Sequence, residues 1–236
     1  MDALFVRAGK RLDSKVKKLR ELRNQRGVTL LEIIIVLGII GVIAAGVVLL
    51  AQRAFVNQDI SDVINNTNSI RTAAIEAYKD QGAYPSSSNS AVGLTKATIK
   101  TATNDSIIAT LVKMGKISAD EAFNGFSSDA FQMGPARTSG NSTVNKGFVL
   151  VVNGLDTETC RNLVSQMGPQ WDYVATTTAA AGADANIDDM DLTGAVNITN
   201  GLLKTLDADS LNPTNIVNNG VCNQSGSTNA AIFGSR

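Results

Sequence analysis

Residues 26–51 read RGVTLLEIIIVLGIIGVIAAGVVLLA, and this stretch decides the fold. From Ile33 to Ala51, 19 consecutive residues carry no charged or strongly polar side chain. At 1.5 Å per helical residue they extend about 28 Å, close to the roughly 30 Å hydrocarbon core of a bilayer. A helix that stays apolar on every side for this length is typical of a membrane span rather than of a buried core helix. We therefore predict a membrane span over residues 28–51.

The segment before this stretch is strongly basic. Residues 1–27 contain nine Lys/Arg and three Asp/Glu, a net charge of +6, whereas residues 28–236 contain 12 basic and 18 acidic residues, a net charge of −6. The positive-inside rule keeps the basic end in the cytoplasm and sends the C-terminal part across the membrane. An ordinary secretory signal is not indicated, because the apolar run is too long and no small-residue cleavage site follows it.

The helical pattern continues beyond Ala51 but changes character. Mostly apolar residues recur at alternating steps of four and three: Val56, Ile60, Val63, Thr67, Ile70, Ala74 and Ala77. This spacing predicts an amphipathic helix with one apolar face. Gly82 and Pro85 then mark the end of the helix. We expect one spine helix over residues 28–81, apolar all round in its first half and amphipathic in its second.

Residues 82–236 are predicted to form a globular head. Helical patterns cover residues 107–114, 118–123 and 156–167, with a helical turn at 202–206. Strand patterns cover residues 146–155, 171–178, 215–222 and 229–234, and residues 83–106 have the Ser, Thr, Ala and Asn content of a surface loop. Strands separated by short helices and long loops indicate the α+β class. The predicted fold is a long N-terminal helix packed on a largely antiparallel β-sheet.

The composition excludes several kinds of catalyst. The chain has no histidine, which removes His-dependent nucleophilic catalysis and His-based zinc sites. Its two cysteines lie far apart, so they form no CxxC motif. Asp184, Asn186 and Asp188 begin like a calcium loop, but Asp189 replaces the glycine of such loops and Ala195 replaces the final glutamate, which favours a solvated acidic loop. No catalytic residue, metal site or cofactor is predicted.

Glu32 lies inside the apolar run, where a carboxylate costs about 2.5–3.5 kcal/mol on insertion scales. One interpretation places it near the membrane edge, within reach of headgroups or water. The other interpretation supplies a cation: if the chain is cut after Gly27, the new α-amino group of Val28 lies at the same depth. The two groups could meet within one helix, or Glu32 of one subunit could neutralise Val28 of the next. Only the second pairing makes the axial stagger between subunits specific.

With its basic leader, Arg26-Gly27, Val28 and Glu32 followed by a long aliphatic helix, the chain resembles the type IV prepilins. The family motif has glycine at the cleavage site, an apolar first mature residue and glutamate as the fifth, and all three match. The 27-residue leader and Val28 are similar to the type IVb class. Further similarity to the toxin-coregulated and longus-type pilins of enteric bacteria lies in residues 111–118, residues 147–155, Cys160 and Cys222.

The resemblance implies a life cycle for the chain. A prepilin peptidase in the inner membrane would cut between Gly27 and Val28 and N-methylate Val28. The precursor would lie in the inner membrane, with its leader cytoplasmic and its head periplasmic. Inner-membrane assembly machinery would then polymerise it, through Glu32, with other pilin subunits. The product would be an extracellular type IVb pilus for adherence, aggregation and colonisation, of which this chain is the major structural subunit. No enzymatic activity and no nucleic-acid partner are implied.

Cys160 and Cys222 fit a disulfide in the oxidising periplasm, which would bound residues 160–222; two buried free thiols are the alternative.

Two other functions are compatible with the sequence. A minor pilin or a type II secretion pseudopilin belongs to the same superfamily. A single-pass membrane-anchored sensor or enzyme belongs to a different class, and it would retain residues 1–27.

Overall fold

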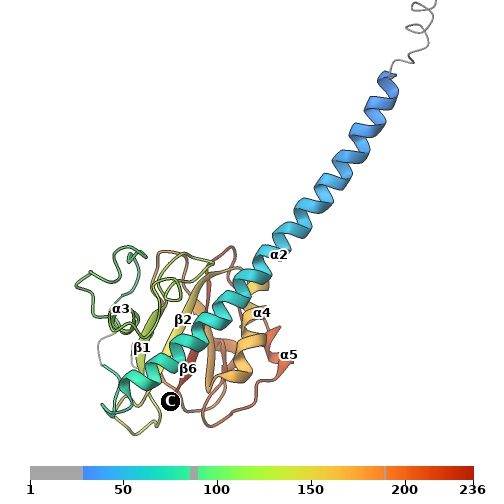
Figure 1. The fold of residues 1–236 in the computed structure, drawn as a ribbon. Coiled ribbons are helices and arrows are strands. Elements are labelled where there is room, and N and C mark those ends of the chain that lie inside the picture. The colour runs from blue at the N-terminus through green and yellow to red at the C-terminus, as the bar shows by residue number, and fades with distance from the viewer. Residues whose placement is uncertain (1–28, 86–89, 189) are drawn as a thin grey trace, which may run out of the picture. The chain divides into compact units, whose positions relative to one another are not determined.

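The computed structural model describes residues 29–85, 90–188 and 190–236 (Figure 1). Two compact units divide between Arg53 and Ala54. We call residues 29–53 the N-terminal unit and residues 54–236 the head unit. One helix, α2 (Leu30–Tyr78), belongs to both units. Its buried residues all lie in the head unit.

In the head unit, the buried side chains of α2 follow a helical spacing: Ile60, Val63, Thr67, Ile70, Ala73, Ala74 and Tyr78. Thr67 fits in this apolar stripe because its hydroxyl donates a hydrogen bond to the Val63 carbonyl at 2.7 Å. The helix ends at Tyr78, three residues before the predicted end. Gly82 follows with a φ of 70°, a left-handed conformation that favours glycine and turns the chain away.

The head unit contains a six-stranded sheet with the order β4-β1-β2-β6-β3-β5. The strands are β1 (Gln132–Arg137), β2 (Gly147–Leu155), β3 (Tyr173–Thr178), β4 (Met190–Asp191), β5 (Leu202–Lys204) and β6 (Asn229–Ser235). The helices are α3 (Ile107–Lys113), α4 (Thr157–Met167) and α5 (Pro213–Ile216), with 3₁₀ turns η1 (Gly168–Gln170) and η2 (Ile198–Asn200). Every strand pairing is antiparallel except β1 with β4, which is parallel. The α+β class and the long helix packed on a mostly antiparallel sheet are therefore confirmed.

The sheet is buried on both faces. Along β2, Phe148, Leu150 and Val152 belong to the core cluster that includes the buried stripe of α2. The alternate residues Val149 and Val151 belong to a second cluster, on the opposite face. Because both faces are covered, β2 reads as one continuous apolar run rather than as an alternating strand.

The second face of the sheet is covered by irregular chain rather than by a helix. Ile187 and Leu192 are buried in its cluster. A Cβ atom on Gly147 would lie 2.9 Å from the Leu192 side chain, and one on Gly234 would lie 2.8 Å from it. Glycine at these two strand positions therefore makes the space that Leu192 occupies.

Two predicted elements take a different structure. The predicted helical turn at 202–206 is wrong, since Leu202–Lys204 forms strand β5 and pairs with β3. The predicted strand at 215–222 is also wrong. Asn212 accepts a hydrogen bond from the Thr214 amide at 3.0 Å and Pro213 takes the first helical position, which starts the short helix α5 instead.

A third predicted element, the helix at 118–123, is replaced by turns. The capping pattern itself is present: the Ser118 amide donates to Glu121 at 2.8 Å, and the Glu121 amide donates to the Ser118 hydroxyl at 3.2 Å. The chain then leaves the helical path, because Phe123 pairs with Ala130 in an isolated antiparallel bridge. Strands β1 and β4 are not predicted from the sequence at all.

Candidate assembly site

The N-terminal unit presents an uncovered apolar helix surface. Every residue from Thr29 to Leu50 is exposed. The large aliphatic side chains between Leu30 and Leu50 are 49–77% exposed. Among the described residues, α2 is the one helix that is long and apolar enough to cross a membrane, judged by length and composition. An apolar surface of this extent needs a cover of lipid or of other protein chains.

Glu32 is the one charged residue in this exposed stretch, and it lies in the first turn of α2. Its backbone amide donates to the Thr29 carbonyl at 3.0 Å and lies 3.3 Å from the Thr29 hydroxyl, so Thr29 caps the helix. The Thr-x-x-Glu spacing of residues 29–32 is the sequence signal of a capping box, and it marks this helix start. Gly27 and Val28, the predicted cleavage and methylation positions, lie outside the described residues.

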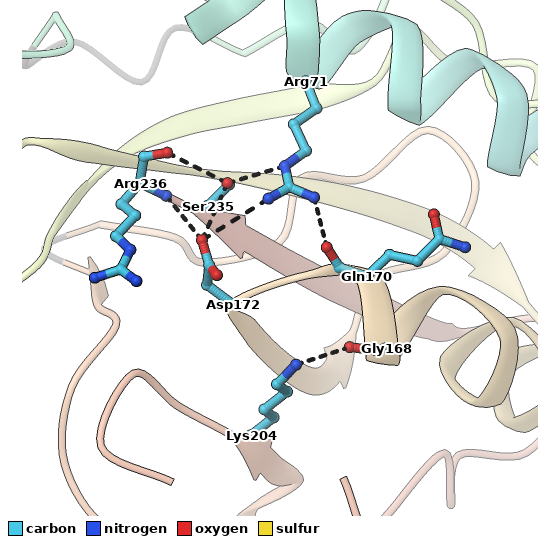
Figure 2. A network of polar contacts seen from close by, with 7 residues as sticks. All are labelled: Arg71, Gly168, Gln170, Asp172, Lys204, Ser235 and Arg236. Carbon is cyan, nitrogen blue, oxygen red and sulfur yellow. Dashed lines mark hydrogen bonds and ion pairs between the residues drawn. The ribbon is translucent and has the colours of Figure 1, made fainter. Parts of the chain in front are cut away.

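Arg71 fastens the second half of α2 to the rest of the head unit (Figure 2). Its Nε donates to the Ser235 hydroxyl at 3.0 Å, and one terminal nitrogen donates to the Gln170 carbonyl. The other terminal nitrogen is 3.9 Å from a carboxylate oxygen of Asp172. The guanidinium also lies 5.1 Å from the centre of the Trp171 ring, within the range of a cation–π interaction. One half-buried side chain thus joins α2 to both β6 and the segment before β3. No local sequence pattern points to Arg71, because its partners are distant along the chain.

Trp171 also belongs to a continuous row of five aromatic rings. Tyr78 at the end of α2 contacts Tyr84, and the row continues through Phe148 and Trp171 to Phe233, with ring centroids 5.0–6.3 Å apart. These distances are in the range in which aromatic pairs add to the stability of a core. Burial raises the pKa of Tyr84 to about 12 and also raises the pKa of Tyr78, so both phenols are neutral at physiological pH.

The structure joins Cys160 of α4 to Cys222 in a disulfide, with the two Cα atoms 6.0 Å apart. Both residues are buried. Arg161, the next residue along α4, donates a hydrogen bond to the Val221 carbonyl at 3.3 Å, which reinforces the same connection. The closed segment holds β3, β4, β5 and α5, so the disulfide ties the less regular part of the sheet to α4.

Candidate metal ligands can be checked only among the described residues. Within the described ranges, no group of three His, Cys, Asp or Glu side chains is close enough to hold a metal ion. Asp184 is exposed, as is Asp188, whereas Asp189 lies outside the described residues. The chemistry that the described surface offers is association: an apolar helix without a cover, one acid at its start, and a rigid head.

A helix with an uncovered apolar first half and a second half packed on a sheet, together with a disulfide-closed region, defines the type IV pilin class. A family model described as "Toxin-coregulated pilus subunit TcpA" matches residues 110–234. A model of the prokaryotic N-terminal methylation motif matches residues 22–48, which include Gly27, Val28 and Glu32. The chain belongs to the toxin-coregulated pilin family.

Individual relatives agree with this assignment. The chain is 38% identical over 196 residues to the toxin coregulated pilin of Vibrio cholerae serotype O1, covering 82% of each chain. It is 36% identical over 187 residues to another toxin coregulated pilin of Vibrio cholerae, covering 78% of this chain and 76% of that one. The crystal structure of TcpA, a type IV pilin from the El Tor biotype of Vibrio cholerae, is similar, with a TM-score of 0.58 and 26% identity over 76% of this chain and 99% of that chain.

Proposed function

We propose that the chain is the major structural subunit of a type IVb pilus, made as a precursor and polymerised into a filament. The observation that carries this proposal is the exposed apolar half of α2 in a chain of the toxin-coregulated pilin family. In the precursor, the lipid bilayer covers this surface. In the filament, the same surfaces of neighbouring subunits cover one another, so the apolar side chains never face water.

Processing prepares the subunit for assembly. A prepilin peptidase cuts between Gly27 and Val28, and the new α-amino group of Val28 is methylated. The match of residues 22–48 to the N-terminal methylation motif supports this step. Before the cut, the basic leader remains on the cytoplasmic side of the inner membrane and the head lies in the periplasm. The disulfide between Cys160 and Cys222 supports an oxidising location for the head.

Glu32 directs how subunits stack. In the apolar core of the filament, where neighbouring subunits exclude water, its carboxylate would be costly unless it met a cation. The amino group of Val28 on a neighbouring subunit supplies that cation, and the pairing sets the axial step between subunits. The finished filament serves adherence, aggregation and colonisation. Inner-membrane assembly machinery drives its growth, and the subunit itself performs no catalysis.

The most direct test is the mass of the N-terminal peptide of the chain in purified filaments. We expect a peptide that begins at Val28 and carries one N-methyl group. Abundant filaments composed mainly of this chain support a major pilin, whereas a trace amount in filaments of another pilin would indicate a minor pilin. A functional chain that retains residues 1–27 would refute the proposal in favour of an anchored sensor or enzyme.

The role of the Glu32 charge is separable from its place in the helix cap. Glu32→Gln keeps the size of the side chain but removes its charge, and we expect processed subunits that form few or no filaments. Thr29→Ala is the matched control, since it removes the cap hydrogen bond observed here and leaves the charge in place. Filament counts by electron microscopy would show normal assembly in the control. Normal assembly of Glu32→Gln would contradict the pairing.

A further inference from the structure

A cleft of about 330 Å³ lies at the C-terminal end of α2, within the head unit. It is formed by chain segments that are far apart in the sequence: the last turns of α2, the residues just after it, the residue before β2 and the residue after β6. Its charged lining residues are Lys79, Lys146 and Arg236, and Ile75, Tyr78 and Tyr84 also line it. All three cations are exposed.

Three of the side chains that line the cleft are cationic. No aspartate or glutamate lines it. Within the described ranges, none of the three cationic side chains forms an ion pair, whereas Arg71, Lys96 and Lys116 elsewhere in the head unit each have an acidic partner.

Glu76 and Asp172 interact with Lys79 and Arg236 without forming an ion pair with either. Lys79 helps to lower the pKa of Glu76, but the larger cause is Lys116, which holds the Glu76 carboxylate at 2.8 Å. Asp172 accepts a hydrogen bond from the backbone amide of Arg236 at 3.3 Å, and Figure 2 shows the Arg236 guanidinium apart from that contact.

The arrangement is suited to a carboxylate. Three like charges around one cleft repel one another, and an anion placed between them relieves this repulsion. The clefted shape and the apolar wall of Ile75 strengthen the field compared with an open surface. Tyr78 and Tyr84 add no negative charge, because burial keeps their phenols protonated. The volume accommodates a carboxylate together with its aliphatic stem.

We propose that this cleft binds a carboxylate of a second copy of the chain. The inference rests on the proposed function, because polymerisation brings other copies into contact. The chain also supplies the acids: residues 28–236 contain 18 acidic and 12 basic residues. Several exposed acids of the head unit form no hydrogen bond or ion pair within the described residues, and they are Asp62, Glu158, Asp184 and Asp209.

A carbodiimide tests the contact in intact filaments, because it couples a lysine amine to a touching carboxylate with loss of water. Treated wild-type filaments should give a covalent dimer on a denaturing gel. Peptide mass spectrometry of that dimer should show Lys79 or Lys146 joined to an Asp or Glu of another chain. The double variant Lys79→Arg/Lys146→Arg keeps the positive charge but cannot form the amide. It should assemble into filaments and lose the dimer.

The control is Lys100→Arg, which changes another exposed lysine in the same way and should leave the dimer unchanged. A dimer that persists in the double arginine variant would overturn the inference. Coupling of these lysines only within one chain, for example to Asp80, would also overturn it.

A double charge reversal tests a different occupant. If Lys79→Glu/Lys146→Glu left the filaments intact but abolished their retention on heparin, the occupant would be an acidic polysaccharide, and the inference would also be overturned. Intact wild-type filaments without the dimer would refute this contact alone, whereas absence of filaments would refute the proposed function.

Discussion

The two halves of α2 have the same helical backbone but differ in what covers their apolar side chains. Between Ala54 and Tyr78, the apolar side chains form a stripe that the chain's own sheet and helices bury. Between Leu30 and Arg53, apolar side chains point in all directions and none is buried. The second half is therefore stabilised by folding, whereas the first half needs lipid or other subunits. The first half of α2 therefore stays uncovered until lipid or other subunits associate with it.

Removing the disulfide should have the largest effect on the stability of the head unit alone. Cys160 and Cys222 are 62 residues apart, so in the chain-entropy model their link contributes on the order of 4 kcal/mol. We expect Cys160→Ser/Cys222→Ser to unfold at much lower urea concentration in detergent. Circular dichroism should still show the helix of the N-terminal unit after the head has unfolded. Simultaneous loss of both would show that the two units are not independent.

The next largest effect should come from a matched pair of substitutions in α2. Ile70 is fully buried, and Ile70→Ala should reduce the free energy of unfolding of the head by about 3 kcal/mol through lost burial and a cavity. Ile40 is 55% exposed, and Ile40→Ala should change the same quantity by less than about 0.5 kcal/mol. Urea titration in detergent measures both. Equal effects would contradict the division of the helix into a buried and an uncovered half.

Replacing Arg71 tests whether its polar network fastens the helix. Arg71→Ala removes the bonds to Ser235 and Gln170, and leaves the Asp172 carboxylate, which is 27% exposed, without its guanidinium partner. We expect a loss of about 2 kcal/mol in the free energy of unfolding, in the range of charged hydrogen bonds. Arg71→Lys should recover only part of it, because an ammonium cannot make the same set of bonds. Full recovery would indicate that charge alone matters.

The smallest expected effect is the loss of the stability contribution of Glu121 at acid pH. The backbone amide of Ser118 is the main reason that the pKa of Glu121 is lowered, followed by the hydroxyls of Ser118 and Ser69. Since folding depresses this pKa, the stabilisation is complete above the ordinary glutamate pKa of about 4.3 and is lost as the pH falls through the lower folded value. The stability difference between wild type and Glu121→Gln should therefore shrink below about pH 4.3. A difference that does not vary with pH would assign it to another cause.

Much of the fold follows from local patterns in the sequence. The stripe of α2, helix α4 with its Asp156 cap, and the strands β2 and β6 carry spacings that tertiary contacts reinforce. Asp156 accepts a hydrogen bond from the Thr159 amide at 2.8 Å, as an N-cap should. In these elements, local preference and long-range packing favour the same structure, which is why the prediction succeeds.

The remaining elements depend on contacts that no short window contains. Strand β1 includes Gly134 and Pro135, which normally indicate a turn. Proline is tolerated there because β4 pairs with β1 only at Ala136 and Arg137, so Pro135 has a strand neighbour on one side only. Strand β5 is three residues long, and its pairing with β3 decides its conformation.

The residues of the candidate site also divide into those that the sequence predicts and those that only the folded structure brings together. The position of Glu32 within the apolar run is evident from the sequence, and so is the availability of the two cysteines for pairing. The network of Arg71 is not, because its partners lie 99 to 164 residues away along the chain. The cleft of Lys79, Lys146 and Arg236 likewise forms only when distant segments fold together.

Trp171 is the one tryptophan of the chain. It is buried, and its ring contacts the Arg71 guanidinium and the Phe233 ring. Its intrinsic fluorescence therefore reports on the head unit alone, without a contribution from the N-terminal unit. A red shift of its emission would signal that the helix has detached from the sheet or that water has entered the aromatic row. The chain thus carries its own optical probe, and subunits can be followed from detergent into filaments without a label.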